Sequence, residues 1–176
     1  MKLHEIHVIV GLGNPGAAYG RTRHSVGFMV LDRFAELNNA TAWREKDKSE
    51  QSEIVINNMK ILLIKPQTYM NNSGQALVHL GKAGIKAENI MVIHDELEKP
   101  FGTVSIKQGG SAHGHNGLRS VIATIGDQFW RVRVGIGRPT NKEDVGSYVL
   151  ETFSEKRELV EHMIEHACQE IRQALE

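Results

Sequence analysis

The stretch GLGNPGAAYGRTRHSVGF, residues 11–28, follows directly on the apolar run IHVIV, residues 6–10. An apolar run that leads into G-x-G-x-x-G is typical of a strand and the phosphate-binding loop of a dinucleotide-binding unit. In such a unit the helix begins inside the glycine motif, so that its N-terminus meets the pyrophosphate. Here Pro15 and Gly16 interrupt the motif, and residues 17–23 separate it from the helical period, which begins at Val26. We therefore predict a strand over 6–10, a polar loop, and a helix over 26–38.

The dinucleotide interpretation also requires an acidic residue about 20 positions further on, at the end of the second strand. Asp32 and Glu36 are near that spacing, but both fall within the predicted helix 26–38. A nucleotide-dependent oxidoreductase thus stays an alternative that only cofactor binding would support. The other interpretation is that the loop positions two polar side chains of its own, Asn14 and His24.

Composition limits the class of protein. The chain has 176 residues, of which 40% are hydrophobic and 24% are charged, as in an ordinary globular domain. No run of 18 apolar residues exists, so we expect no membrane-spanning helix. The N-terminus runs almost at once into a strand and leaves no room for a targeting peptide. Cys168 is the only cysteine, which fits a reducing compartment; we expect the cytosol, although the sequence does not distinguish it from mitochondrion or plastid.

The rest of the chain alternates between predicted strands and helices. A polar loop is predicted over 41–52, then a hairpin of strands 53–57 and 60–65 turning at Asn58-Met59. Ser73 is the predicted N-cap of a helix that runs to Lys82. Further strands are predicted over 90–94, 103–107 and 131–137, with helices over 116–125 and 154–175. This pattern predicts a single α/β domain over 1–176, with a mixed, mostly parallel twisted sheet flanked by helices.

Charge is unevenly distributed although the formal net charge is zero. The segment 99–138 has Asp127 as its only acid, and 151–176 is rich in glutamate. This asymmetry favours a local anion-binding face over a wholly basic protein, although exposed elements that simply carry charge would give the same pattern. The basic residues of 99–138 are Lys99, Lys107, Arg119, Arg131, Arg133 and Arg138.

Polar side chains gather where the predicted strands end. Asn14 follows the first strand, Asp95 follows strand 90–94, and His24 precedes the first helix. Ligands of open α/β sheets bind at the carboxyl ends of the strands, so these groups are expected to meet in one pocket. A histidine and an aspartate without a serine or cysteine nucleophile indicate activation of water, with amides to bind a carbonyl oxygen. The predicted chemistry is hydrolysis of an ester or a similar bond.

A metal site is an open alternative. His113 and His115 with Asp95 imitate part of a zinc site. Two histidines on a glycine loop are a sparse ligand set without a firm third member, so we expect no metal and no cofactor.

Five motifs together resemble the bacterial-type peptidyl-tRNA hydrolase family. They are GLGNPGAAYGRTRHSVGF, KPQTYMNNSG, VIHDEL, GGSAHGHNGLRS and RVRVGIGRP, which stand in the family's order across residues 6–150. The resemblance implies an enzyme that cleaves the ester between a peptide and the 3′-terminal ribose of tRNA. It further implies recycling of tRNA from interrupted translation, no metal, and a peptidyl-tRNA partner; we expect a monomer.

The resemblance also implies a role for each matching residue. His24 matches the catalytic base and Asp95 the acid that orients it. Lys107 and Arg133 match basic residues that bind a tRNA phosphate, which would give the basic segment a purpose. Residues that match substrate-binding positions of the family are Asn14, Tyr19, Met70, Asn71 and Asn116.

This sequence departs from the family pattern at two places near these residues. Ser25 stands where the family commonly has asparagine, and we expect its hydroxyl to keep a contact with tRNA or with the peptide backbone. Ser111 and Ala112 alter the glycine loop. The resemblance therefore leaves a second candidate function, that of a non-catalytic RNA-binding protein of the splicing-factor type on the same fold. The intact set of catalytic residues favours the enzyme.

Overall fold

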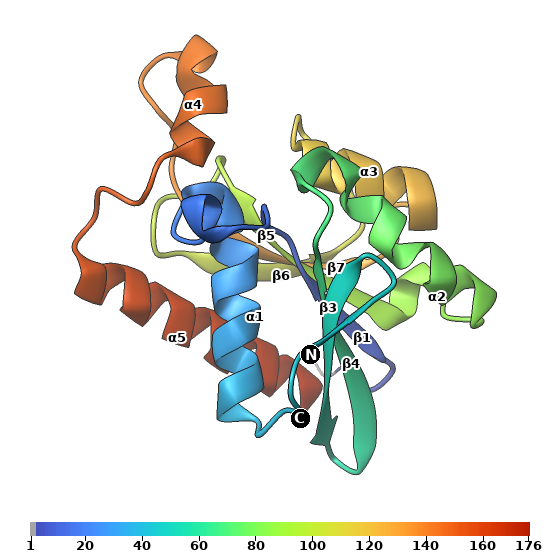
Figure 1. Cartoon of the computed structure of the whole chain (residues 1–176). Helices are drawn as coiled ribbons and strands as arrows, with labels where there is room; N and C mark the ends of the chain where they lie inside the picture. The colour runs from blue at the N-terminus through green and yellow to red at the C-terminus, as the bar shows by residue number, and fades with distance from the viewer. Residues whose placement is uncertain (1–2) are drawn as a thin grey trace.

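A computed structural model describes residues 3–176 as one α/β domain (Figure 1). Its seven-stranded sheet has the order β2-β3-β4-β1-β5-β7-β6. The strands are β1 (Val8–Gly11), β2 (Arg44–Lys46), β3 (Ser49–Ile56), β4 (Met59–Pro66), β5 (Ile90–Glu96), β6 (Val104–Gln108) and β7 (Trp130–Gly135). The helices are α1 (Val26–Leu37), α2 (Val78–Lys82), α3 (Asn116–Ile125), α4 (Val145–Leu150) and α5 (Arg157–Leu175), with 3₁₀ turns η1 (Ala17–Tyr19), η2 (Arg23–Ser25), η3 (Met70–Leu77), η4 (Ala87–Asn89) and η5 (Lys142–Asp144).

The four central strands are parallel, and the outer strands are antiparallel. β1 pairs in parallel with β4 and β5, and β5 pairs in parallel with β7. The hairpin β3–β4, its extension β2 and the edge strand β6 are antiparallel. The carboxyl ends of β4, β1, β5 and β7 therefore lie along one edge, as the predicted mixed sheet requires.

Helices cover both faces of this sheet (Figure 1). On one face, α1 and α5 bury a core with Ile9, Ile93 and Val132. On the other face, α2 and α3 pack over Val10, Ile64 and other alternate strand residues. Side chains alternate across a strand, so the apolar runs of the central strands supply both cores at once.

The predicted loop over 41–52 is wrong. Residues 44–46 and 49–56 form the antiparallel strands β2 and β3, joined at Asp47 and Lys48, whose φ angles are 51° and 58°. No apolar alternation marks these strands, because all of β2 is exposed and the start of β3 buries polar Gln51 and Ser52 instead. The neighbouring hairpin is confirmed, but its turn is Asn57-Asn58.

The predicted role of Ser73 is also wrong. The helical segment begins at Met70, and the Ser73 hydroxyl lies inside it, donating to the Met70 carbonyl at 2.7 Å. A serine that hydrogen-bonds a preceding carbonyl offers the same sequence signal as an N-cap. α4 was not predicted at all, because its six residues include none that is buried. The remaining elements lie within a few residues of their predicted ranges.

Glycines of the opening stretch serve close packing. A Cβ on Gly27 would lie 2.4 Å from the Ile93 carbonyl oxygen and 2.5 Å from that of Leu12. A Cβ on Gly11 would in turn lie 2.4 Å from the Gly27 carbonyl oxygen. The first turn of α1 thus rests directly on β1 and β5, a distance that only glycine permits. This contact places η2, and with it His24, at the carboxyl edge of the sheet.

Gly27→Ala is expected to destabilise the fold by about 3 kcal/mol, because the added methyl group meets backbone atoms that cannot move aside. The matched control is Gly81→Ala in α2, where a Cβ meets nothing within 4 Å. That substitution should instead stabilise by about 0.5–1 kcal/mol through helix propensity. Urea unfolding monitored by circular dichroism measures both changes. Equal effects at the two positions would contradict the packing argument.

Candidate active site

His24 and Asp95 meet at the carboxyl edge of the sheet. Asp95 lies near the end of β5, and His24 lies in η2, immediately before α1. The His24 Nδ1 atom lies 2.9 Å from Asp95 Oδ2. The side chain of Asp95 is 2% exposed and that of His24 is 12% exposed. The pair expected from the sequence is therefore formed, with the imidazole edge still reachable from solvent.

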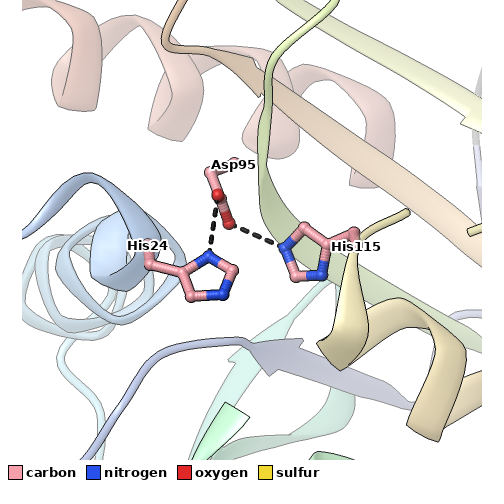
Figure 2. Close-up of side chains that lie close together, drawn as sticks. All are labelled: His24, Asp95 and His115. Carbon is pink, nitrogen blue, oxygen red and sulfur yellow. Dashed lines mark hydrogen bonds and ion pairs between the residues drawn. The ribbon is translucent and has the colours of Figure 1, made fainter. Parts of the chain in front are cut away.

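A second histidine, His115, shares the same carboxylate (Figure 2). Its Nε2 atom lies 2.8 Å from Asp95 Oδ1, so each carboxylate oxygen accepts from one imidazole. His115 is also the N-cap of α3, because its Nδ1 accepts from the Leu118 N–H at 3.1 Å. Both ring nitrogens of His115 are thereby engaged. The sequence placed His115 in the loop that enters the helix 116–125, among the groups that could meet in one pocket or hold a metal. It did not predict the bond to Asp95 or the N-cap, although the position directly before a predicted helix is a signal for a cap.

Electrostatics fix which atoms carry protons. Burial acts to raise the pKa of Asp95, but the two imidazoles outweigh it and hold that pKa well below its ordinary value. An ionised carboxylate only accepts, so His24 Nδ1 and His115 Nε2 must both donate. Burial acts to lower the pKa of His24, yet the charge and hydrogen bond of Asp95 raise that pKa above its ordinary value. Of the two histidines bonded to Asp95, only His24 keeps a nitrogen, Nε2, without a hydrogen-bond partner among residues 3–176.

A cavity of about 300 Å³ opens beside this pair. Its lining includes His24, Asp95, His115 and the buried His94. Burial, and to a lesser extent the nearby His115, lowers the pKa of His94 to about 4. Val145 and Val149 of α4 form another wall of the cavity, and the glycine loop 108–115 forms a third wall. A small polar substrate group can therefore reach the histidine–carboxylate pair from solvent.

Asn14 is buried and is held from two sides, by Met70 and by Ser25, the residue that follows His24. Its Oδ1 accepts from the Met70 N–H at 2.7 Å, and its own N–H donates to the Ser25 Oγ at 3.2 Å. Ser25 is fully buried and also accepts from Thr22 at 3.4 Å. The expectation that Ser25 contacts tRNA or peptide is therefore wrong, since its hydroxyl supports the Asn14 backbone inside the protein. The Asn14 Nδ2 donor has no partner within the described part of the chain.

The other residues expected to bind substrate fall into two groups. Asn116 lines the cavity at the start of α3 and is exposed, with its Oδ1 accepting from Arg119 at 3.1 Å. Met70 is buried, and its sulfur lies close to the α carbon of Gly117 in α3. Of the five residues expected to bind substrate, only Asn116 lines the cavity; Asn14, Tyr19, Met70 and Asn71 do not. Tyr19 packs edge-on against Tyr69 at 6.4 Å, and Asn71 is exposed on η3.

Lys107 and Arg133 both line the cavity on adjacent strands. Lys107 is opposite Arg131 in the β6–β7 register, which places Lys107, Arg131 and Arg133 on one face of the sheet. Arg131 is buried and its guanidinium donates to the carbonyls of Ser111 and Gly110, so it holds the glycine loop. Arg133 donates to Glu96 at 2.9 Å.

The excess of basic over acidic side chains in residues 99–138 is partly neutralised in the folded protein by acids from outside that segment. Glu96 and Glu98 lie just before that segment, and they pair with Arg133 and Arg138 respectively. These two glutamates neutralise part of the basic face, although neither belongs to the segment 99–138. Lys107 lines the cavity and has no acidic partner within 4.0 Å among residues 3–176, so its charge is available to an anion.

Two other kinds of chemistry find less support in this geometry. Cys168 is buried in the core, and burial raises the pKa of its thiol to about 12, which disfavours the reactive thiolate. A metal ion held by His24, Asp95 and His115 would find ligand atoms within 4.8 Å of one another. It would have to displace both N–H protons that now bond the carboxylate. His113, the other histidine expected in a metal site, is exposed and forms no hydrogen bond or ion pair with His24, Asp95 or His115.

Comparison with known proteins identifies the class. The family model described as peptidyl-tRNA hydrolase matches residues 8–176. A peptidyl-tRNA hydrolase of Methylobacterium sp. (strain 4-46) is 44% identical over 169 residues, covering 93% of this chain and 83% of the relative. One from Rubrobacter xylanophilus is 49% identical over 141 residues, covering 80% and 78%. The crystal structure of peptidyl-tRNA hydrolase from Acinetobacter baumannii is 36% identical, with a TM-score of 0.90 over 99% of this chain and 91% of that one.

These findings define an enzyme of the ester hydrolase class on a single α/β domain. More particularly, the chain belongs to the peptidyl-tRNA hydrolase family. Across the described residues 3–176, no helix has the length and apolar character needed to cross a membrane.

Proposed function

We propose that this protein hydrolyses the ester of peptidyl-tRNA by a water molecule that His24 activates. The observation that carries the proposal is the free nitrogen: of the two histidines on Asp95, only His24 keeps an unengaged Nε2, and it lines the cavity. This atom takes a proton from water as the oxygen attacks the ester carbonyl. Asp95 stabilises the imidazolium that forms. His24 then returns the proton to the 3′ oxygen of the leaving ribose, which releases peptide and free tRNA.

The amides have the complementary role of holding the substrate. The carbonyl oxygen gains negative charge during attack, and a fixed N–H donor stabilises it most when that donor need not reorganise. Asn14 suits this role because Met70 and Ser25 fix both its side chain and its backbone. Asn116 and Asn71 offer further donors and acceptors from the starts of α3 and η3. Tyr19 and Met70 shape the substrate side of this region.

Lys107 and Arg133 bind a phosphate of the tRNA in this proposal. Both lie on one sheet face that lines the cavity, and Lys107 is free of acidic partners within the described chain. Phosphate contacts supply affinity and position without reading base sequence. The fold thus separates the groups that hold the tRNA from those that break the ester.

The direct test is release of N-acylated amino acid from an N-acyl-aminoacyl-tRNA, with EDTA present and His24→Ala beside the wild type. Hydrolysis by the wild type alone would support the reaction, the base and independence from a divalent metal together. No hydrolysis by either protein, with tRNA still bound, would overturn the enzyme proposal and favour the RNA-binding alternative. Loss of wild-type activity in EDTA that zinc restores would contradict the metal-free mechanism.

The reaction should lose rate on acidification. The base must be neutral, and the Asp95 carboxylate raises the pKa of His24 above its ordinary value although burial opposes it. As pH falls through that raised pKa, His24 Nε2 becomes protonated and kcat/KM drops. A profile of kcat/KM between about pH 5 and pH 9, corrected for spontaneous ester hydrolysis, measures the effect. An acid limb centred well below the ordinary histidine pKa would contradict it.

Lys107→Ala and Arg133→Ala should weaken a full-length tRNA substrate far more than a minimal peptidyl-nucleoside ester. Each removes a phosphate contact, so the dependence of log(kcat/KM) on log salt should fall by about one. The exposed Lys82→Ala in α2 is the matched control and should change neither quantity. Equal losses on both substrates would argue against phosphate binding by this pair.

A further inference from the structure

α4 is a wall of the active-site cavity that has little core of its own. Val145, Gly146 and Val149 line the cavity, yet no residue from Gly137 to Lys156 is buried. Figure 1 shows α4 standing away from the rest of the domain, between β7 and α5 in the chain. Short exposed helices are only marginally stable without tertiary contacts. Something outside the segment must therefore fix its position.

Arg23, the residue directly before His24, contacts this segment from inside. Its side chain is 4% exposed. Nη1 donates to the Tyr148 carbonyl at 2.9 Å, and Nη2 donates to the Ser154 hydroxyl at 3.3 Å. The guanidinium carbon lies 3.8 Å above the Tyr148 ring. The one acidic partner, Glu151, is 3.4 Å away and 62% exposed, so the ion pair itself adds little.

Backbone and side-chain bonds extend these contacts on both sides. The Arg23 N–H donates to the Glu151 carbonyl at 3.0 Å, and Thr22 pairs with Thr152. The Tyr148 hydroxyl donates to the Ile136 carbonyl at 2.6 Å, just beyond β7. Arg23 thus joins the loop that carries the base to the C-terminal half of α4 and to the residues that follow it, while Tyr148 joins the same helix to the chain beyond β7.

We infer that Arg23 is a positioning residue whose buried guanidinium fixes α4 as a wall of the active-site cavity. A residue that only filled this space could be apolar, since desolvating a cation is costly. The planar fork instead reaches a carbonyl, a hydroxyl and an aromatic face spread over residues 148–154. His24 is held separately by Asp95, so Arg23 acts on substrate binding and not on proton transfer.

The inference rests on the proposed function for its kinetic part. In Arg23→Met, KM for N-acyl-aminoacyl-tRNA should rise about tenfold while kcat stays within about threefold. The acid limb of the kcat profile should not move, because the His24–Asp95 pair is unchanged. Amide exchange followed by mass spectrometry over residues 145–155 should accelerate about tenfold, while β5 and α5 keep wild-type protection. Arg23→Lys keeps the charge and should recover only part of both effects.

Matched variants separate anchoring from general damage. Arg21→Met removes an exposed arginine two positions away and should match the wild type in exchange and kinetics. Tyr148→Leu removes the stacked ring from the other side, so it should reproduce the Arg23→Met pattern even if Arg23→Met folds poorly. Unchanged exchange over 145–155 in both variants, or a fall in kcat with KM unchanged, would overturn the inference. Absence of hydrolysis by the wild type would count against the proposed function alone, because exchange reports the anchoring of α4 without substrate.

Discussion

His24→Ala is expected to lower kcat for peptidyl-tRNA by about 10³-fold or more, close to abolition, because a positioned general base contributes about 10²–10⁴-fold. The other histidine on Asp95 cannot replace it, because the Asp95 carboxylate and the Leu118 N–H occupy both nitrogens of His115. The fold should stay intact, since the His24 side chain belongs to neither hydrophobic core. Single-turnover hydrolysis of N-acyl-aminoacyl-tRNA measures the loss of rate, and a thermal melt of the variant measures whether the fold is intact.

The matched control is His113→Ala. His113 lines the same cavity but is exposed and lies on the glycine loop. We expect its removal to change kcat by no more than a few-fold, since it makes no contact with Asp95. If His24→Ala retained activity near that of the wild type, His24 would not be the base. If the two variants lost the same large factor, the loss would reflect the cavity and not proton transfer.

Asp95→Asn is expected to slow turnover by about 10²-fold or more, for a reason specific to this geometry. Two imidazole N–H groups now face one carboxylate, which accepts from both. An asparagine offers one acceptor and one NH₂ donor, so one histidine must turn its ring or exchange its tautomer. His115 resists, because its Nδ1 must stay an acceptor for Leu118. The change therefore falls on His24, whose Nε2 then carries the proton and cannot act as base.

The pH profile of Asp95→Asn distinguishes this mechanism from simple unfolding. Burial acts to lower the pKa of His24, and Asp95 is what raises it. Without the carboxylate, the acid limb of kcat/KM should move to lower pH even as the maximum rate falls. Asp127→Asn, an exposed aspartate at the end of the α3–β7 connection, is the control and should leave the limb unchanged. An acid limb that stayed in place in Asp95→Asn would mean that Asp95 does not set the pKa of the base.

The central fold could be predicted because its signals are local. The apolar runs of β1, β5 and β7 indicate strands buried on both faces, and the helical periods of α1, α3 and α5 each indicate one buried face. The β2–β3 extension escaped prediction, since β2 is exposed and the start of β3 buries polar residues, so neither has an apolar period to detect. Ser73 misled because a serine inside a helix and a serine at its start look alike in sequence.

The site was predictable only in part. His24, Asp95 and Asn14 could be expected together because each follows or ends a parallel strand or precedes the first helix. The sharing of Asp95 between two histidines depends on where the glycine loop returns to the sheet, which no local pattern encodes. The roles of Arg131 in holding that loop, and of Glu96 in pairing with Arg133, likewise follow from the β5–β7 register.

Asp95 accepts hydrogen bonds from two histidines, and this arrangement has a consequence for how the molecule folds. His24 and His115 stand 71 and 20 positions from Asp95 in the chain, and they precede α1 and α3, which cover opposite faces of the sheet. Contacts of that sequence separation form late, after the loops between them have closed. Recovery of catalysis during refolding should therefore trail the recovery of helical ellipticity, and the onset of turnover would mark the moment when both layers have docked on β5.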